Sequence, residues 1–578
     1  MTVLLIYPYF LEPRLHADEI AAVPMGLYYV GAMLKAHGYP VQILNWHAAR
    51  DATDLIKETL ISARPDIIGF SVLTANRWGA VDIAGLAKEL NPQVTVIFGG
   101  IGATFLWKHL LTHFAQIDAV VLGEGEHTFL KLVRALEAGH TLQDLRDIPG
   151  LALRSSEGPF QTQAAAPIVD LDQLPPPARY FDFSHVSLSR GCPGRCTFCG
   201  SPQFWGRRVR AHSPDYFVDQ LAVLAQRGTT FFYVSDDTFT LDPRRVIAVC
   251  RKIVDRGLKI TWQAIAKVNA VRGDMLYWMR KAGCVQVSYG VESGSASIRR
   301  KLCKDIRIDQ IRRAFKLTVG HGILARAYFI YGAPGETWQT IEETLSLIQA
   351  IKPLSAIFYI LDIFPGTELY SDFKQRTGYS DDIWLQRMED ILYFESDPAL
   401  DQETVRAFGR HLRKSYHQAL PQFALSIELE QDTDLQAEQA DFLSRLGMTF
   451  SHGDYVCLDI QPRPRQVAMN LFNRALNLHP DQRAFWGAAL ICQVQGEWPK
   501  ALAYLEKGLA HFPSSPSLNI SLAVSYIHQG LFQDALDILL PFQASAEALP
   551  HIVHCYQALG DKTKAAEYAA RAMISRHA

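Results

Sequence analysis

Short apolar runs alternate with amphipathic stretches over the first 125 residues. The runs are rich in branched residues, as buried parallel strands are, and patterns such as 25–37 and 79–90 fit helices. Strand–helix alternation of this kind predicts a doubly wound, flavodoxin-like α/β domain, which binds ligands at the carboxyl ends of its strands. The predicted strands are 2–7, 41–45, 66–72, 94–98 and 118–122.

The same alternation resumes near residue 181 and continues to about residue 370. Repeated strand–helix units favour a parallel barrel, and six units in place of eight favour an incomplete one. We therefore expect a partial (βα)6 barrel whose chemistry lies at the carboxyl ends of its strands. Its predicted strands are 185–189, 230–235, 259–265, 285–290, 325–331 and 356–361.

A stretch rich in Ser, Gln, Ala and Pro separates the two α/β regions and ends in Leu174-Pro175-Pro176-Pro177. Proline stiffens a chain and interrupts both helix and strand, so a linker is expected here. The predicted domains are an α/β domain at 1–150, a linker at 151–180, the barrel at 181–370, a helical extension at 371–460 and helical repeats at 461–578.

The repeats are indicated by three glycines near the C-terminus. Gly496, Gly530 and Gly560 each precede an alanine by five positions, at spacings of 34 and then 30 residues. This period resembles that of tetratricopeptide repeats, in which small residues let each helix pair nest on the next. An irregular helical bundle is the alternative.

The composition argues against some kinds of partner and location. The chain of 578 residues has a net charge of −2, which argues against a nucleic-acid partner bound through bulk charge. Polar or charged residues interrupt every apolar run short of a membrane span, so no transmembrane segment is expected. The nine cysteines show no pairing pattern and the N-terminus has no signal-peptide features, which together predict a cytoplasmic protein.

Three cysteines in one short loop carry the strongest chemical signal. Cys192, Cys196 and Cys199 have the spacing CxxxCxxC among small, glycyl and prolyl residues. Four thiolates usually hold a [4Fe–4S] cluster, so three leave one iron open to another ligand, and an open metal position is typical of catalytic sites. A disulfide or a zinc knuckle is the alternative, although no fourth zinc ligand stands at a conventional spacing.

This spacing, with Phe198 before the third cysteine, resembles the radical S-adenosylmethionine (SAM) superfamily, in which SAM chelates the open iron. The resemblance implies a [4Fe–4S] cluster on the three cysteines and SAM contacts at the later strand ends. Glu292 corresponds to the ribose contact, and Lys267 and Arg326 are candidates for the SAM carboxylate. The full set of SAM-binding candidates is Phe198, Asp236, Asp237, Lys267, Glu292, Arg326, Gly332, Gly335 and Glu336.

Glycine clusters at the strand ends of the first domain allow a bulky ligand to approach the backbone. Together with Pro24-Met25-Gly26-Leu27-Tyr28, they resemble the cobalamin-binding domain that precedes many radical SAM cores. A nucleotide-binding or vestigial flavodoxin-like domain is the alternative. The resemblance implies cobalamin contacts at Ser71, Leu73, Gly99, Gly100, Gly102, Gly123, Glu124 and Gly125.

One signature of that family is absent. The Asp-x-His-x-x-Gly segment, whose histidine ligates cobalt, does not occur, and His47 lacks its context. The resemblance therefore implies cobalamin held without a protein imidazole ligand. Asn76, Arg77 and Trp78 follow the third predicted strand and are expected to face the corrin.

The two resemblances together imply a cobalamin-dependent radical SAM enzyme. The favoured activity is a C-methyltransferase that acts on an unactivated carbon through a 5′-deoxyadenosyl radical and methylcobalamin. A cobalamin-dependent radical SAM cyclase or oxidoreductase is the alternative, and a docking module with an inactive barrel is a weaker one. The expected partners are a small-molecule or carrier- or peptide-bound substrate, an electron donor such as flavodoxin or ferredoxin, and a protein at the repeats.

Overall fold

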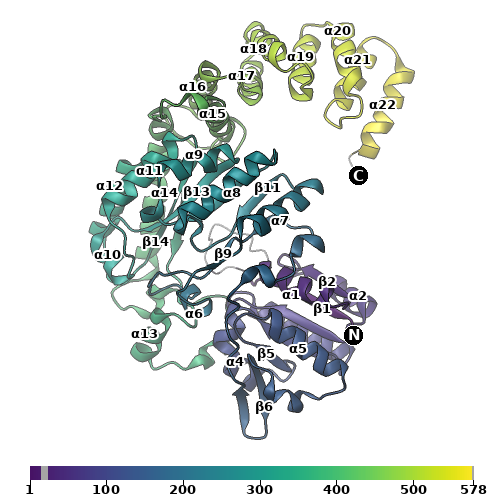
Figure 1. The fold of residues 1–578 in the computed structure, drawn as a ribbon. Helices are drawn as coiled ribbons and strands as arrows, with labels where there is room; N and C mark the ends of the chain where they lie inside the picture. The colour runs from purple at the N-terminus through teal and green to yellow at the C-terminus, as the bar shows by residue number, and fades with distance from the viewer. Residues whose placement is uncertain (13, 15–23, 576–578) are drawn as a thin grey trace. The chain divides into compact units, whose positions relative to one another are not determined.

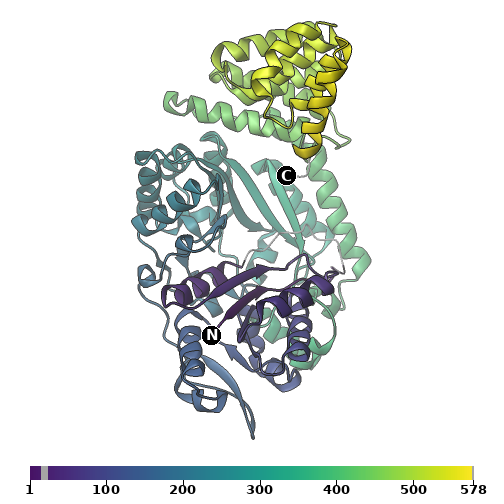
Figure 2. The same ribbon diagram turned by 90° about the vertical axis from the view of Figure 1, so that its right-hand side faces the viewer.

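The computed structural model describes residues 1–12, 14 and 24–575. It contains two compact units, which are Met1–Phe315 with Ala325–Lys414, and Lys316–Leu324 with Ser415–Ala578. The first unit contains both α/β regions, whereas the second is helical (Figures 1 and 2). The two sheets therefore belong to the same compact unit.

The first sheet has seven strands in the order β2-β1-β3-β4-β5-β6-β7. Its first five strands pair in parallel, and each of the five predicted strands is confirmed to within one or two residues at its ends. Central β1 is buried along its whole length, as its continuous apolar run requires. The strands are β1 (Val3–Tyr7), β2 (Val41–Asn45), β3 (Ile67–Ser71), β4 (Thr95–Gly99), β5 (Ala119–Val121), β6 (Leu151–Ser155) and β7 (Gly158–Gln161).

Helices connect these strands and begin close to the carboxyl ends of the strands that precede them. Gly100, with φ of 91°, turns the chain from β4 directly into the next helix. A Cβ on Gly100 would lie 2.9 Å from the carbonyl oxygen of Val72, so only glycine fits this turn. The helices are α1 (Met25–Ala36), α2 (Thr53–Ala63), α3 (Arg77–Leu90), α4 (Ile101–His113) and α5 (Glu126–Glu137).

The linker expected at 151–180 begins as part of the sheet. Strands β6 and β7 form an antiparallel hairpin on the edge of β5, and Gly158 with φ of 114° makes its turn. The sheet therefore extends past the predicted boundary at residue 150. The signal was weak because Ser, Glu, Gly and Pro interrupt the short apolar run.

The second sheet has six strands, and they follow one another in chain order from β8 to β15 without the short β9 and β10. Pairs β8–β11–β12–β13 and β14–β15 run parallel. All six predicted strands are present, although the first is shorter than expected. They are β8 (His185–Val186), β11 (Phe231–Val234), β12 (Thr261–Ala266), β13 (Cys284–Glu292), β14 (Leu324–Tyr331) and β15 (Ser355–Ile360).

Helices alternate with these strands. Ser213 caps the first long helix by accepting the N–H of Tyr216, and Pro214 occupies its first turn. A separate two-stranded ribbon, β9 (Ser189–Arg190) with β10 (Arg210–Ala211), encloses the cysteine loop and α6. The helices are α6 (Ser201–Phe204), α7 (Pro214–Gln226), α8 (Pro243–Asp255), α9 (Gly273–Lys281), α10 (Ala296–Lys301), α11 (Ile308–Gly320), α12 (Trp338–Ile351) and α13 (Glu368–Thr377).

From residue 402 onward the described chain forms helices and no strands. Gly496, Gly530 and Gly560 have φ of 74°, 77° and 83°, and each lies in the turn between two helices. The alanine five positions after each glycine is buried, which leaves room for the neighbouring helix. The helices are α14 (Gln402–Leu425), α15 (Gln436–Ser451), α16 (Pro464–Leu478), α17 (Gln482–Val494), α18 (Trp498–His511), α19 (Pro516–His528), α20 (Phe532–Leu539), α21 (Leu549–Ala558) and α22 (Lys562–Ser575).

Within the described ranges, no helix combines the length and the apolar character needed to cross a bilayer.

Two glycines of α3 provide a test of this packing. A Cβ on Gly79 would lie 2.2 Å from the carbonyl oxygen of Tyr9, whereas a Cβ on Gly85 would meet nothing within 4 Å. We expect Gly79→Ala to lower the free energy of unfolding by about 1–3 kcal/mol through overpacking. Gly85→Ala should raise it by about 0.5–1 kcal/mol, because alanine favours a helix interior. Urea titrations of the two variants check the difference, and equal effects would contradict the close approach of α3 to Tyr9.

Candidate active site

The cysteine loop is fixed at both ends by backbone contacts. Strands β9 and β10 pair on either side of it, and the N–H of Cys192 donates to the carbonyl of Gly206 at 3.4 Å. Gly191, with φ of 101°, begins the loop, and a Cβ there would lie 2.7 Å from the carbonyl oxygen of Arg208. Within the loop, the N–H of Thr197 donates to the carbonyl of Leu302 at 3.2 Å. Backbone contacts therefore fix both ends of the loop and its middle.

The protein environment favours the neutral form of two of the three thiols, Cys196 and Cys199. Cys192 is buried, and Cys196 and Cys199 are half-buried. Burial raises the pKa of Cys199 to about 11 and also raises the pKa of Cys196. Lys304 and Lys267 act in the opposite direction on Cys196. Because iron binds thiolates, these two ammonium groups favour the form of Cys196 that can hold a cluster.

The donor set of the loop fits a cluster. Three thiolates can hold three irons of a [4Fe–4S] cluster and leave the fourth open to another ligand. A structural zinc site is closed by four protein ligands, whereas the cysteine loop supplies three.

Glu292 and Lys304 form a buried ion pair beside the cysteine loop. The Nζ of Lys304 donates to Oε1 of Glu292 at 2.7 Å, and their side chains are 12% and 8% exposed. Glu292 has φ of 66°, a strained value for a non-glycine residue of the kind often found at functional sites. Gly290 leaves the space for the pair, because a Cβ there would lie 2.8 Å from Nζ of Lys304. Glu292 was a predicted SAM contact, whereas Lys304 was missed.

Lys267 and Phe198 lie close to the cysteines, as expected. Lys267 directly follows β12, and a Cβ on Gly194 would lie 3.1 Å from its Nζ and 3.3 Å from Sγ of Cys192. Phe198 is half-buried within the loop itself. Gly194 therefore allows the lysine to approach the first cysteine.

Asp236 and Asp237 brace the two flanks of the loop. Asp236 is buried and accepts the N–H of Leu188 at 2.7 Å and the hydroxyl of Ser189, and burial raises its pKa to about 7. Asp237 accepts the hydroxyl of Ser201, just beyond the third cysteine. Both carboxylates are thus engaged within the protein, whereas the sequence placed them near the SAM amino group.

The loop after β14 is stabilised by a hydrogen bond between its own residues. Glu336 is buried and accepts the N–H of Ala333 at 3.0 Å, and burial raises its pKa to about 7. Gly332 and Gly335 have φ of 74° and 70° and make the turn that this contact closes. Both glycines and Glu336 therefore lie at the carboxyl end of a strand, where the sequence predicted them.

Arg326 does not reach this end of the sheet. It is the third residue of β14, pairs in register with Ser355 at the start of β15, and donates from Nε to the Ser355 hydroxyl at 2.9 Å. About 16 Å of strand separates it from the carboxyl end at Tyr331. Its prediction as a SAM contact was therefore wrong. The sequence located the strand correctly but did not distinguish its two ends.

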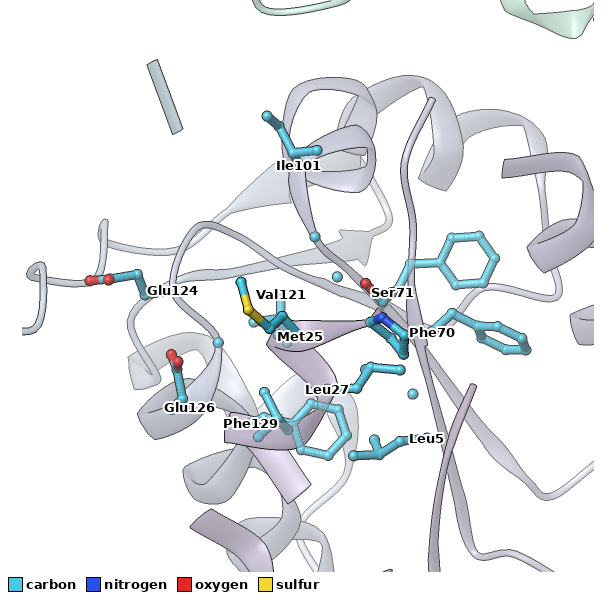
Figure 3. Close-up of a pocket in the computed structure, with 18 of the residues that line it drawn as sticks. Leu5, Met25, Leu27, Phe70, Ser71, Ile101, Val121, Glu124, Glu126 and Phe129 are labelled. Atoms are coloured by element: carbon cyan, nitrogen blue, oxygen red, sulfur yellow. The ribbon is translucent and has the colours of Figure 1, made fainter. Parts of the chain in front are cut away.

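An apolar cavity of about 290 Å³ lies at the carboxyl ends of the strands of the first sheet (Figure 3). All the predicted cobalamin contacts except Gly102 line it. Gly102 instead packs against the chain after β3, because a Cβ there would lie 2.5 Å from the carbonyl carbon of Leu73. Phe204 and Trp205, which directly follow the cysteine loop, also line the cavity and were missed. The cavity is thus shared by both α/β regions.

Asn76, Arg77 and Trp78 do not face this cavity. Arg77 is buried and donates to the carbonyls of Trp384 and Gln386 at 3.4 and 3.2 Å, and Nε1 of Trp78 donates to Gln386 at 3.0 Å. Asn76 accepts the N–H of Leu73 at 2.7 Å. The expectation that these three residues face the corrin was therefore wrong, since Arg77 and Trp78 hold the segment after the second sheet and Asn76 bonds to the chain just after β3. His47 is exposed, as an ordinary loop residue is, and the described lining contains no histidine.

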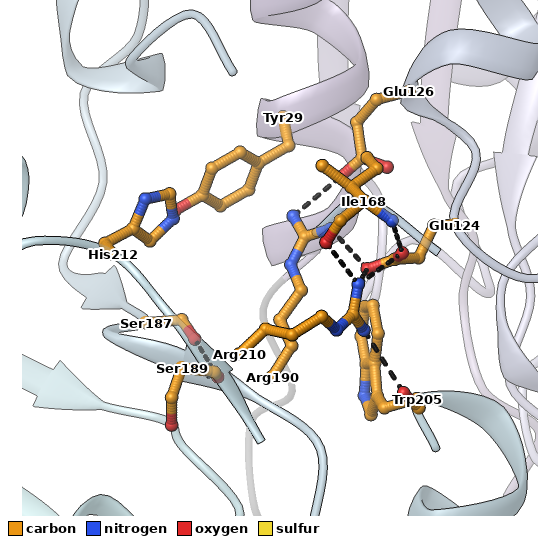
Figure 4. A network of polar contacts seen from close by, with 10 residues as sticks. All are labelled: Tyr29, Glu124, Glu126, Ile168, Ser187, Ser189, Arg190, Trp205, Arg210 and His212. Atoms are coloured by element: carbon orange, nitrogen blue, oxygen red, sulfur yellow. Dashed lines mark hydrogen bonds and ion pairs between the residues drawn. The ribbon is translucent and has the colours of Figure 1, made fainter. Parts of the chain in front are cut away.

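Four buried charges connect the cavity to the cysteine loop (Figure 4). Arg190, two residues before Cys192, donates to Glu124 at 3.0 Å and to Glu126 at 2.6 Å. Arg210 donates to both oxygens of Glu124, at 2.9 and 2.7 Å. All four side chains are between 5% and 7% exposed. The two glutamates and the two arginines compensate one another in charge, which makes their burial tolerable.

Backbone and aromatic groups complete this network. The N–H of Ile168 donates to Glu124 at 2.8 Å, and the guanidinium of Arg190 lies 4.9 Å from the ring centroid of Tyr29 and 5.1 Å from that of Trp205. Figure 3 shows Glu124 and Glu126 at one side of the cavity. The Glu124 carboxylate therefore fastens the domains together, although its backbone still lines the cavity. Neither arginine was predicted as a site residue. The position of Arg190, two residues before Cys192, could have drawn attention to it, whereas Arg210 carried no sequence signal.

Comparisons with known proteins agree with this geometry. The chain matches the radical SAM superfamily model over residues 186–348 and the B12 binding domain model over residues 20–133. It is 30% identical over 393 residues to the anaerobic magnesium-protoporphyrin IX monomethyl ester cyclase of Rubrivivax gelatinosus, covering 64% of this chain and 71% of that one. It is 32% identical over 360 residues to an uncharacterized methyltransferase of Pyrococcus horikoshii, covering 60% and 77%.

A solved structure shares the fold. The radical SAM methyltransferase TsrM of Kitasatospora setae, determined with cobalamin and a [4Fe–4S] cluster, superposes with a TM-score of 0.60 at 17% identity, over 82% of this chain and 99% of that one. The chain belongs to the radical SAM superfamily, among the members that carry a B12 binding domain. It is an enzyme, and its cofactors are a [4Fe–4S] cluster, SAM and cobalamin.

The four buried charges should contribute to the stability of the fold. Glu124→Gln leaves two buried guanidinium groups with one carboxylate, and we expect it to lower the free energy of unfolding by about 3–5 kcal/mol. The exposed Glu157→Gln, the same chemical change in the turn between β6 and β7, should have almost no effect. Urea titrations at neutral pH measure both, and a Glu124→Gln variant as stable as the wild type would contradict the role of the pair.

The difference in the free energy of unfolding between the wild type and Glu124→Gln should depend on pH. Burial alone would raise the pKa of Glu124, but hydrogen bonds from Arg210 and Ile168 and the charge of Arg190 lower it overall. A lowered folded-state pKa stabilises the fold fully above the unfolded value of about 4.3, and this stabilisation is lost as pH falls through the folded value. The gap between the wild type and Glu124→Gln should therefore be constant above about pH 5 and shrink below it.

Proposed function

We propose that this chain is a cobalamin-dependent C-methyltransferase that acts on an unactivated carbon. The observation that carries the proposal is the cavity of the B12 binding domain, which Phe204 and Trp205 line from just beyond the cysteine loop. A corrin held there lies next to the part of the chain that holds the cluster. The methyltransferase name of the Pyrococcus horikoshii relative supports the same activity.

The residues present fit the three cofactors. Cys192, Cys196 and Cys199 are the proposed ligands of three irons, and Glu292 with the Gly332–Glu336 loop is the proposed SAM site. The glycines at the ends of β4 and β5 leave the backbone open toward the proposed corrin. When bound, the cluster and SAM supply a radical that removes a hydrogen atom from the substrate, and the corrin supplies a methyl group.

The protein chain itself would position the cofactors and exclude water from them. The Glu292–Lys304 pair and the buried Glu336 fix the walls beside the cysteine loop. The apolar lining of the cavity, which includes Leu5, Leu27 and Phe129 (Figure 3), would exclude water from a bound corrin. We propose that the six-stranded sheet curves as a partial barrel around this site.

Cyclisation or oxidation is the second candidate. It is favoured by the relative from Rubrivivax gelatinosus, a ring-closing ester cyclase of similar identity. The two reactions differ in products, because methylation adds one CH2 to the substrate whereas cyclisation removes hydrogen or adds oxygen.

We propose two protein partners. The first is an acidic electron carrier of the flavodoxin or ferredoxin kind, which would dock at a cleft of about 890 Å³ beside Cys196. The cleft is rich in cations, although the whole chain has a net charge of −2. Its charged lining residues are Arg195, Lys267, Arg299, Arg300, Lys304, Arg307 and one acid, Asp305. The second partner is a protein or carrier-bound substrate at helices α17–α22, which we propose are tetratricopeptide-like repeats.

Product analysis tests the reaction. The enzyme is reconstituted anaerobically with iron, sulfide, hydroxocobalamin and SAM, reduced with dithionite and supplied with candidate substrates. We expect it to form S-adenosylhomocysteine and 5′-deoxyadenosine in equal yield. Cys199→Ser should abolish 5′-deoxyadenosine, whereas Cys457→Ser, at an exposed cysteine outside the loop, should not. Mass spectrometry of the product identifies the added CH2. Deoxyadenosine without S-adenosylhomocysteine would reject methyl transfer and favour the cyclase.

Reduction kinetics test the electron-carrier site. Charge reversal in Arg195→Glu with Arg300→Glu should slow reduction of the cluster by a flavodoxin about tenfold or more at low salt, because steering depends on complementary charge. Dithionite, a small reductant, should reduce the variant at the wild-type rate. The matched control is Arg406→Glu, at an exposed position of α14. Equal flavodoxin rates in the double variant and the wild type would place the carrier elsewhere.

A further inference from the structure

Two histidines and one aspartate form a compact group away from the cysteine loop. His109 and His113 lie one turn apart on α4, and Asp382 lies in the short helix η6 (Asp381–Leu385) after the second sheet. Their ligand atoms all lie within 4.8 Å of one another. Within the described part of the chain, no other group of three His, Cys, Asp or Glu side chains converges in this way.

The distances fit a single tetrahedral metal ion. Nε2 of His113 lies 2.9 Å from Oδ1 of Asp382, and Nδ1 of His109 lies 3.7 Å from the same oxygen. With metal–ligand bonds of about 2.0–2.1 Å, the ligands of tetrahedral zinc lie about 3.4 Å apart. The two measured distances fall on either side of that value, so small side-chain rotations would complete the geometry.

The burial of His109 without a hydrogen-bond partner also points to a bound ion. Its side chain is 2% exposed, and neither ring nitrogen has a hydrogen-bond partner. A buried polar group without a partner is costly, and native structures seldom retain one without a reason. The hydrogen bond between His113 and Asp382 accounts for those two residues but leaves His109 unexplained. A metal ion bound at Nδ1 of His109 would offset this cost.

The surrounding contacts hold Asp382 in place. Its N–H donates to the hydroxyl of Ser380 at 3.0 Å. A few residues further on, Arg77 and Trp78 hold the carbonyl of Gln386, and Arg387 donates to Asp82 of α3 at 3.0 Å. The segment 380–387 is therefore laid against α3 and α4 of the B12 binding domain, which brings the aspartate to the two histidines.

We propose that His109, His113 and Asp382 bind one Zn²⁺, with water as the fourth ligand. Imidazole and carboxylate groups are common zinc ligands. The side chain of Asp382 is 62% exposed, so the ion and its water can reach the site from solvent. The ion fastens the segment after the radical SAM sheet onto α4, whose first residue, Ile101, lines the cobalamin cavity. The proposal depends on neither the methyltransferase nor the cyclase activity.

Metal analysis of the full-length enzyme tests the site. We expect the enzyme purified anaerobically and equilibrated with zinc sulfate to hold one zinc per chain in addition to its cluster iron. Asp382→Asn and His113→Gln should lose this zinc and keep their iron, whereas His127→Ala, an exposed histidine of the same domain, should keep both. Asp382→Asn changes an exposed side chain, so its result does not depend on a buried substitution being tolerated.

X-ray absorption at the zinc edge identifies the ligands. We expect a shell of nitrogen and oxygen at about 2.0–2.1 Å without sulfur. Three outcomes would overturn the proposal: no zinc in the wild type, zinc retained by Asp382→Asn, or a sulfur shell at about 2.3 Å, which would place the zinc on cysteines.

Discussion

The buried pairing of Glu124 and Glu126 with Arg190 and Arg210 is the interaction on which the arrangement of this enzyme depends. Glu124 comes from the loop after β5 of the B12 binding domain and Glu126 from the first turn of α5. The two guanidinium groups come from the ribbon that encloses the cysteine loop. Charges this deeply buried are tolerated only when paired, so neither side is stable in this position without the other. The pairing fixes the corrin cavity next to the cysteines, which explains why Phe204 and Trp205 line it.

A second level of support lies around the cysteines themselves. Asp236 and Asp237 brace the residues on either side of the loop, and Lys267 and Lys304 bring positive charge to the Cys196 thiol. Glu292 accepts a strained backbone conformation and pairs with Lys304, in space that Gly290 leaves free. These groups hold the cofactor ligands through buried polar contacts, a geometry that depends on the fold and not on the loop alone.

The sequence predicted the strands well because each is a continuous apolar run, and it predicted the cysteines because their spacing is set by one local loop. It was wrong about Arg326 because an apolar pattern does not say which end of a strand carries chemistry. It was wrong about Arg77 and Trp78 because their partners at 384–386 are some 300 residues away along the chain. Arg210 was missed for the same reason, because its partner Glu124 is 86 residues away along the chain. The β6–β7 hairpin is local and was missed because Ser, Glu, Gly and Pro interrupt its short apolar run.

The central claim is that the network holds the corrin and the cluster next to one another, and electron paramagnetic resonance tests it most directly. In the reduced enzyme with cobalamin bound, Co(II) and the [4Fe–4S]⁺ cluster both carry unpaired electrons. The account predicts a magnetically coupled spectrum in the wild type that weakens in Glu124→Gln. A wild-type spectrum equal to the sum of two isolated signals, or coupling that is unchanged in the variant, would contradict it.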